Sequence, residues 1–285
     1  MKPLIVLTKW IARTAAVLLL VIVGSTVLVR FAPGYLSDAR EMDSRYAGAA
    51  RAELSTEAAR SHSLRQMLSS EVGGWMHGDA GVSRHYGVPV SELILPRLAV
   101  TGGLLLRSLV LAWSVAACAS ILSSAGRNPS LLWQAPATLL LAIPTAAMAT
   151  LCLLSGIGGP ISVMGLLLAA RDFKFIHRAL HKAWMGPDIL QARTQGIRTW
   201  RILLKHVLPS VATQLCALAS LSIVTALSAL VPVEVIFNIP GIGELAWNAA
   251  LNRDLPVLLA VTVIMALAVT FAGMASQNPA EWNAA

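Results

Sequence analysis

Apolar runs long enough to cross a lipid bilayer dominate this sequence. A spanning helix needs about 20 mostly apolar residues, and six stretches meet or approach that length: 10–29, 98–122, 131–155, 157–170, 211–231 and 256–275. The short 157–170 stretch is expected to extend through Arg171 toward His177. Only 13% of the residues are charged and 56% are hydrophobic, which excludes an ordinary soluble enzyme or a disordered tail. The sequence predicts an all-α polytopic membrane protein with six transmembrane helices.

The distribution of charge predicts how this protein is oriented in the membrane. Six crossings place both termini on one side, together with a loop around Arg127 and the long loop 171–209. That side collects twelve basic and three acidic residues, whereas the other side has nine basic and eleven acidic ones. Because Lys and Arg accumulate in cytoplasmic loops, we expect both termini and the 171–209 loop to be cytoplasmic.

The same reasoning divides the chain into four regions. Residues 1–30 are expected to form an uncleaved transmembrane helix, because no convincing cleavage site follows the apolar stretch. Residues 31–97 form an outward-facing loop region, 98–275 the transmembrane core, and 276–285 a short cytoplasmic tail.

The cytoplasmic loop 171–209 has its own helical pattern. Gly186-Pro187 and Gly196 bracket a short helix at 188–195, and a second helix is expected at 197–207, before Leu208-Pro209. On that second helix, basic and apolar residues fall on opposite faces. The basic face is Arg198, Arg201 and Lys205; the apolar face is Ile197, Trp200, Leu203, Leu204 and Val207. The pattern fits a helix at the lipid headgroups and a docking element for a cytoplasmic partner equally well.

This loop resembles the cytoplasmic signature of importer-type ABC permeases. Nine residues separate Gly196 from His206-Val207-Leu208-Pro209, and Ala192 occupies the second alanine position of the signature. The segment 191–196 is similar to the form found in the dipeptide/oligopeptide/nickel branch. At the start of the signature, Leu190 and Gln191 replace the Glu and Ala of the family pattern.

Further short motifs resemble the same branch, in the same order along residues 30–260. They are Arg30–Gly34, Gly78–Ser83 with Pro89-Val90, Arg97–Thr101, Ala142–Pro144, Val233–Phe237, Pro240–Gly243 and Arg253–Pro256. Together they are similar to the first of the two paired permeases of that branch.

The resemblance implies a type I ABC importer permease fold in the bacterial cytoplasmic (inner) membrane. It implies one half of a translocation path for peptides or a similar small solute, with nickel chelates as a further candidate. The implied partners are a second permease subunit, two ATPase subunits, an extracytoplasmic substrate-binding protein and the lipid bilayer, with no nucleic acid. The sequence has no Gly-x-x-x-x-Gly-Lys-Ser/Thr motif, so we expect ATP and Mg to bind the partner ATPase. This chain is expected to catalyse nothing and to bind no cofactor or metal.

Two groups of candidate site residues follow. The ATPase-coupling loop comprises Asp188, Ala192, Arg193, Gly196, Arg198, Arg201, Leu208 and Pro209. The translocation path or gate comprises Arg107, Glu234, Phe237, Pro240, Gly241, Gly243 and Asp254. Ser222, Thr225 and Ser228 are small polar residues that also suit a path between helices.

Two observations motivate the gate group. Arg107 is the one charge inside a predicted span, and such charges are costly and usually functional. Segment 232–256 is too polar for a span and too apolar for an exposed loop, so we expect a hairpin turning at Pro240-Gly241 and tucked into protein. Glu234 needs a partner there, because a buried unpaired carboxylate takes up a proton, and Arg253 is the candidate.

Two other functions remain open at this point. A secondary transporter would work without an ATPase, but it should show an internal repeat and midplane charges, and the sequence shows no convincing repeat. A non-transporting structural membrane subunit derived from such a permease would explain the degenerate start of the coupling signature.

Overall fold

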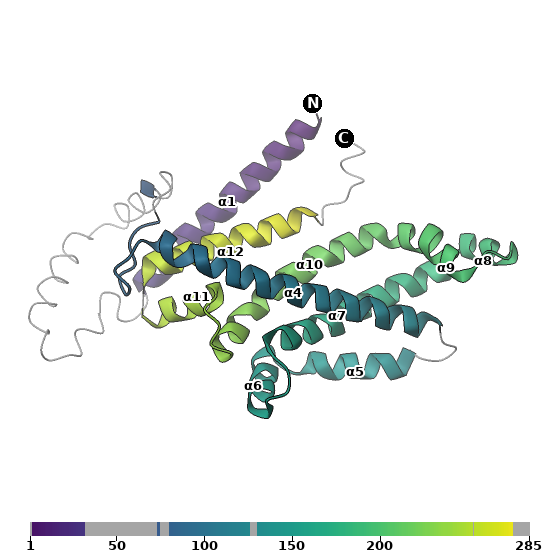
Figure 1. The fold of residues 1–285 in the computed structure, drawn as a ribbon. Helices are drawn as coiled ribbons and strands as arrows, with labels where there is room; N and C mark the ends of the chain where they lie inside the picture. Colours follow the sequence, from purple (N-terminus) through teal and green to yellow (C-terminus); the bar gives the residue numbers. More distant parts are fainter. Residues whose placement is uncertain (1, 32–72, 75–79, 126–129, 253, 276–285) are drawn as a thin grey trace, which may run out of the picture. The chain divides into compact units, whose positions relative to one another are not determined.

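The computed structural model describes residues 2–31, 73–74, 80–125, 130–252 and 254–275. Most of the predicted outer loop, the loop around Arg127, Arg253 and the tail 276–285 lie outside the described residues. The described chain is helical (Figure 1): α1 Lys2–Phe31, α4 Val90–Ala125, α5 Ser130–Ala142, α6 Thr145–Ser155, α7 Pro160–Trp184, α8 Pro187–Thr194, α9 Thr199–Ile202, α10 Leu208–Ile236, α11 Ile242–Leu251 and α12 Leu255–Ala275. A π-helical turn, Leu203–Val207, joins α9 to α10. Within the described ranges, β pairing is limited to one bridge between Val82 and Pro89.

The chain divides into two units. The first unit comprises residues 1–4, 99–243 and 268–285, and the second comprises 5–98 and 244–267. The first unit therefore holds most of α4, all of α5 to α10 and the turn after α10. The second unit holds most of α1, the start of α4 and most of α11 and α12.

Three helices are long and apolar enough to cross a membrane. They are Val90–Ser123, Thr199–Ile236 and Leu255–Gly273, and the pair α5–α6 makes a fourth if it counts as one broken span. The first three cover the spans predicted at 98–122, 211–231 and 256–275, with α4 starting earlier than expected. The first predicted span lies within α1, whose apolar stretch Ile11–Ser25 is shorter. Within the described residues, the helical, multi-pass character predicted from the apolar runs is confirmed.

The prediction of one continuous span at 131–155 was wrong. Helices α5 and α6 meet at an angle of 96°, and the break falls at Ile143-Pro144. Pro144 has φ −59° and ψ 142°, outside the helical region. A proline cannot donate a helical hydrogen bond, and it pushes the preceding residue out of the α conformation. A bent pair therefore replaces the straight span.

The helix that was expected to extend from 157–170 toward His177 runs further, to Trp184, and takes in the first part of the predicted 171–209 loop. Residues 171–184 form the second half of α7, and Asp172, Phe173 and Ile176 are buried there. The Ser222 hydroxyl on α10 lies 2.8 Å from both carboxylate oxygens of Asp172 and donates to that group. Arg171 donates in turn to the Thr225 hydroxyl. The charged residues at this point of α7 thus serve to pack it against α10, and the loop proper begins after Trp184.

The core of the first unit forms where α4, α6, α7 and α10 meet. Its most buried residues include Ala112, Met164 and Ala226, which are fully buried. Gly165 on α7 permits a close approach to α4, because a Cβ there would lie 2.6 Å from Leu111 Cδ2. Small residues at helix contacts let membrane helices pack tightly without a driving force from water. This core is the scaffold that carries α10 and the turn that follows it.

Candidate functional site

The chain forms a turn directly after α10, where a turn was predicted. Helix α10 ends at Ile236, and the Ile239 N–H donates to the Glu234 carbonyl oxygen at 2.8 Å. Asn238 adopts φ +52°, a left-handed conformation that asparagine tolerates better than most residues. Gly241 then leads into α11, so the second arm of the hairpin is a helix.

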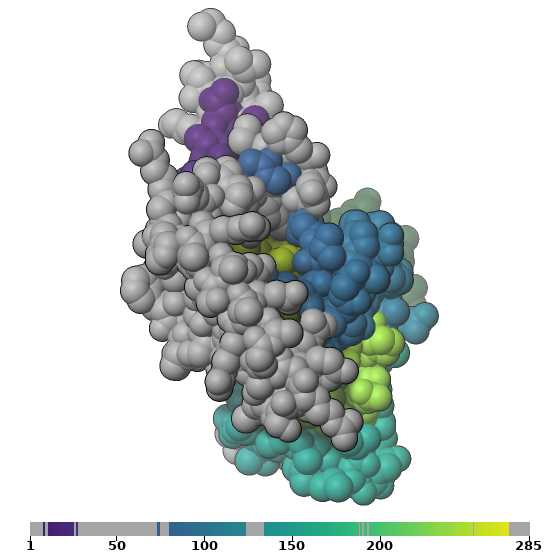
Figure 2. All heavy atoms as spheres, turned by 90° about the vertical axis from the view of Figure 1, so that its left-hand side faces the viewer, coloured from purple at the N-terminus to yellow at the C-terminus, as the bar shows by residue number. Residues whose placement is uncertain are grey.

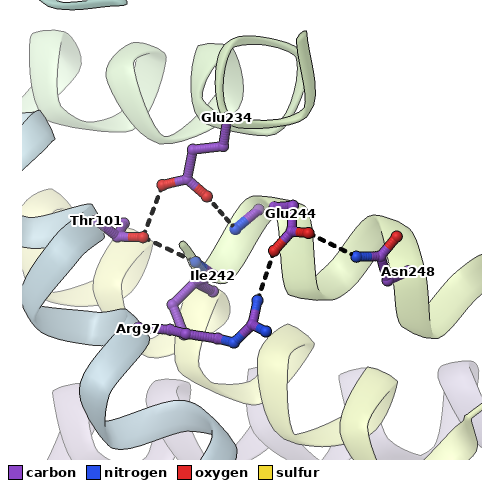
Figure 3. A network of polar contacts seen from close by, with 7 residues as sticks. Arg97, Thr101, Glu234, Ile242, Glu244 and Asn248 are labelled. Carbon is purple, nitrogen blue, oxygen red and sulfur yellow. Dashed lines mark hydrogen bonds and ion pairs between the residues drawn. The ribbon is translucent and has the colours of Figure 1, made fainter. Parts of the chain in front are cut away.

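The Glu234 carboxylate joins α10 to this turn and to α4. Its Oε1 accepts a hydrogen bond from the Thr101 hydroxyl at 2.7 Å, and its Oε2 accepts one from the Gly243 N–H at 2.7 Å (Figure 3). Thr101 Oγ1 also accepts the Ile242 N–H at 2.8 Å. Glu234 is completely buried, so its carboxylate oxygens depend on donors from α4 and from the backbone. Arg253, the partner suggested by the sequence, lies outside the described residues.

The glycines of the turn are required by the approach of this carboxylate. A Cβ on Gly241 would collide with both carboxylate oxygens of Glu234, and a Cβ on Gly243 would lie 2.8 Å from Val231 Cα. Only glycine lets the backbone come this close. We refer below to Thr101, Glu234, Gly241, Ile242 and Gly243 as the glutamate clamp.

In the second unit, Asp254 secures the turn that follows Ser83. Its carboxylate accepts a hydrogen bond from the Ser83 hydroxyl and from the N–H groups of Arg84 and His85, both at 3.2 Å. The Tyr86 N–H donates to Ser83 Oγ at 2.9 Å. Asp254 is 1% exposed. Figure 2 shows the surface of this turn together with α4 in blue. We refer to this arrangement as the aspartate anchor.

A second polar contact of that unit links the start of α4 to α11. Arg97 Nη1 lies 2.6 Å from Glu244 Oε2, and Asn248 Nδ2 donates to Glu244 Oε1 at 2.8 Å (Figure 3). The side chains of Arg97 and Glu244 are each 20% exposed. An ion pair shielded to this extent is a stronger link than a surface pair.

The structure brings some of the predicted gate residues together and separates others. Glu234, Gly241 and Gly243 form one cluster, and Phe237 packs on the core shared by α4, α7 and α10. Asp254 belongs to the other unit and has its own partners. Pro240 is exposed at the turn, and Arg107 is exposed on α4.

The predicted coupling segment begins with a short helix that is fixed by its ends. Helix α8 starts at Pro187 and ends at Thr194, within one residue of the prediction. Gly196 adopts φ +72°, and the Ile197 N–H donates to the Ala192 carbonyl oxygen at 3.3 Å. This is a glycine-dependent helix end of the Schellman type. Ala192 itself is 4% exposed and packs in the core of the first unit. The side chains of Asp188 and Arg193 lie outside the described residues.

The second coupling helix differs from its prediction in two ways. It does not end at Leu208-Pro209, because α9, the π-turn and α10 run on without a break. In a regular α-helix the ring of Pro209 would clash with the backbone carbonyl of Lys205, four residues earlier. Lys205 lies in the π-helical turn, so the backbone departs from α-helical geometry at this point. The buried face also differs from the predicted apolar face. Val207 is buried as expected, and so is Ile202, which was not predicted, whereas Trp200 and Leu204 are 52% and 53% exposed.

The basic face of that helix is exposed as predicted. Arg198, Arg201 and Lys205 are all exposed, and the Arg201 guanidinium lies 5.4 Å from the centre of the Trp200 ring. Leu208 and Pro209 are exposed as well. The segment thus presents cations and an aromatic ring together on its free side.

Sequence reasoning missed the partners of the acidic residues. In the sequence, Thr101, Ser83 and Arg97 stand out only as members of short motifs, and nothing singles out Glu244. The short motifs contained the signal for these contacts, because their polar residues pair with one another in the structure. Ser83 pairs with Asp254, and Thr101 pairs with Glu234 and with the Pro-Gly-x-Gly turn.

Comparisons with known proteins place this chain in a family. Residues 99–278 match the family described as binding-protein-dependent transport system inner membrane component. The oligopeptide transport system permease protein AppB of Bacillus subtilis is 29% identical over 230 residues, covering 70% of this chain and 72% of that protein. The metal-staphylopine import system permease protein CntB of Staphylococcus aureus is 25% identical over 238 residues, covering 75% and 76%. OppB of Escherichia coli is 26% identical over 106 residues, covering 37% and 35%. The chain therefore belongs to the inner membrane component family of binding-protein-dependent transport systems, as a permease subunit of an ABC importer in the peptide and nickel branch.

Proposed function

We propose that this permease forms half of a translocation path for peptides or metal chelates and that its coupling segment transmits the motion of a separate ATPase to the glutamate clamp. The observation that carries the proposal is one continuous helix, Thr199–Ile236. It begins at the exposed basic face of the coupling segment and ends two residues after Glu234.

The mechanics follow from the rigidity of that helix. At 1.5 Å per residue a helix of this length reaches about 57 Å, enough to connect the two membrane surfaces. A partner that grips Arg198, Arg201 and the glycine-ended helix α8 would move the far end of α10 with it. The clamp then has two arrangements, closed on the turn or released from it, as in other rigid-body switches.

The finer architecture is part of the same proposal. Six crossings, both termini in the cytoplasm and an outward-facing loop before α4 are supported by the charge distribution and by family membership. The complex would contain a second permease, two ATPase subunits and an extracytoplasmic binding protein. ATP and Mg would bind the ATPase subunits, and this chain would do no covalent chemistry.

The proposed cargo rests on the relatives. One is an oligopeptide permease and another a metal-staphylopine permease. Arg107 is exposed on α4 within the segment Val90–Ser123. Because a lipid-facing charge there is costly, we propose that it faces the partner permease or the path, where it suits a solute that carries carboxylates.

The coupling proposal is tested at Gly196. Gly196→Val strains a position with φ +72° and should release the ATPase subunits and abolish transport, whereas Gly196→Asn is the matched control, since asparagine tolerates this conformation. The measurements are co-purification of the ATPase subunits and ATP hydrolysis stimulated by the binding protein. If Gly196→Val behaves like Gly196→Asn in both, coupling through this segment is refuted.

The same purification separates the remaining alternative. The degenerate start of the coupling signature at Leu190 and Gln191 favours a structural subunit as the second candidate. A wild-type chain that purifies with other membrane proteins and without any ATPase supports that second function.

The orientation is tested at the turn that follows Ser83. Arg84 is exposed there, and Arg84→Cys in a background lacking Cys118, Cys152 and Cys216 should react with a membrane-impermeant thiol reagent in spheroplasts. A Lys205→Cys control should react only after lysis. The opposite pattern would reverse the proposed topology.

A further inference from the structure

A small polar pocket lies between α5 and α7 in the first unit. Its volume is about 90 Å³, and it is lined by Gln134 and Thr138 from α5 and by Lys174, His177 and Arg178 from α7. In Figure 1 the two helices run side by side. The coupling and gate proposals use none of these five residues.

The pocket wall carries cations without a matching acid. Lys174 is half-buried and Arg178 is exposed, and no ion pair involves either of them within the described part of the chain. The nearest acid on α7, Asp172, is bound to Ser222 of α10. Two residues along a helix correspond to a rotation of about 200°, so Asp172 lies on the opposite side of α7 from Lys174.

The other lining groups are fixed in place. His177 is 8% exposed, its Nδ1 lies 2.8 Å from Ser123 Oγ, and its ring stacks between Phe173 and His181. The Thr138 hydroxyl donates to the Gln134 carbonyl oxygen at 2.7 Å. Donors for a ligand therefore come from the Gln134 amide, the Lys174 ammonium and the Arg178 guanidinium. The site is built for an anion.

The pocket lies where the apolar parts of the surrounding helices end. The apolar segment of α4 ends at Ser123, which touches His177, and that of α5 starts at Gln134. Further along α5, Leu139 and Leu141 are 70% and 41% exposed. This position leads us to expect the pocket at the level of the lipid headgroups, next to exposed apolar side chains of α5.

We propose that this pocket binds the phosphate group of an anionic ligand. Arginine, lysine and amide donors match phosphate oxygens with charge-assisted hydrogen bonds, and basic pockets between membrane helices on the cytoplasmic side take anionic lipid headgroups. The same donors would also bind free inorganic phosphate. The inference does not depend on the cargo or on the coupling mechanism.

The test uses the purified transporter complex in detergent, titrated with phosphatidylglycerol, phosphatidylcholine or inorganic phosphate and followed by native mass spectrometry. Lys174→Gln combined with Arg178→Gln should weaken phosphatidylglycerol binding at least about tenfold, because each removes a charge-assisted bond. Lys182→Gln removes a charge from the same helix outside the pocket and should change binding less than about twofold.

The outcomes separate the two phosphate sources. Loss of phosphatidylglycerol binding that inorganic phosphate cannot compete with identifies a lipid headgroup, and competition by inorganic phosphate identifies a free anion. Gln134→Leu tests the site without removing charge, should the double variant fail to fold, and is expected to weaken binding about threefold. Equal phosphatidylglycerol and phosphate binding by the wild type and the pocket variants, or an equal loss with Lys182→Gln, overturns the proposal.

Discussion

The helix Thr199–Ile236 connects part of the coupling segment to Glu234 of the glutamate clamp, yet the two regions are held in different ways. At the clamp, a fully buried carboxylate is satisfied by Thr101 and by a backbone N–H, and the turn approaches so closely that only glycine fits. At the coupling segment, Ala192 and Ile202 are buried, while Arg198, Arg201 and Lys205 are exposed. The clamp makes its contacts within its own chain, and the coupling segment exposes its cations. The first arrangement favours conformational specificity, and the second is the surface that we propose for the ATPase.

Breaking the clamp at its glycines should have the largest effect. Gly243→Val places atoms against the α10 backbone at Val231, where nothing flexible can move aside. Overpacking of this kind costs about 1–3 kcal/mol or more, and we expect the amount of folded permease to fall at least about tenfold, measured by fluorescence-detected size exclusion. Gly24→Ala, which meets no atom within 4 Å, is the control and should express normally. Equal amounts of the two variants would show that the turn is loosely packed.

Removing the carboxylate should loosen the clamp without destroying the fold. Glu234→Ala leaves the buried Gly243 N–H and the Thr101 hydroxyl without their acceptor, at a cost of about 1–3 kcal/mol for each buried donor left unpaired. We expect basal ATP hydrolysis of the complex to rise and its dependence on the binding protein to fall. Glu234→Gln keeps one acceptor oxygen and should give a smaller change in both. Wild-type hydrolysis and stimulation in the alanine variant would make Glu234 purely structural.

The aspartate anchor extends the comparison to the second unit, where a buried acid again holds backbone N–H groups. Asp254→Ala should free this turn, so that trypsin cuts after Arg84 roughly tenfold faster in spheroplasts if the turn faces outward as proposed, since opening then costs less free energy. Glu92→Ala removes an exposed acid near the start of α4 and should leave the cleavage rate unchanged. Similar cleavage in wild type and Asp254→Ala would mean that the turn is held by other contacts.

The smallest effect on stability is expected at the coupling surface. Arg201→Ala removes an exposed cation and should change the stability of the permease by less than about 0.5 kcal/mol. It should nevertheless weaken association with the ATPase subunits several-fold, more at low than at high salt, because an exposed charge acts through screened electrostatics. The measurement is ATPase retention on the immobilised permease across a salt series. A loss of permease stability with normal ATPase retention would show that Arg201 stabilises the fold and does not bind the ATPase, contrary to the proposal.

The sequence alone predicted the structural features that depend on a short stretch of the chain. The long apolar runs placed α4, α10 and α12, because the bilayer sets the length of a spanning helix. Gly186-Pro187 and Gly196 placed α8 to within one residue, because those residues set backbone angles locally. The charge pattern showed which face of the coupling helix would be exposed. The bend at Pro144 was also a local signal, and reading 131–155 as a single span overlooked it.

Only the tertiary structure decided which distant groups meet. Thr101 and Glu234 are 133 residues apart in sequence, and Ser83 and Asp254 are 171 apart, so no local preference links them. The partners of Arg171 and Asp172 on α7, Thr225 and Ser222 of α10, are about 50 residues away in sequence. The join between α9 and α10 stayed helical because packing of Ile202 and Val207 against the core outweighed the proline at 209. Local chemistry determined where most helices form and where α5 and α8 end, because glycine and proline restrict the backbone directly. Long-range packing and hydrogen bonding of buried groups determined how far α7 and α10 extend and what their polar residues do.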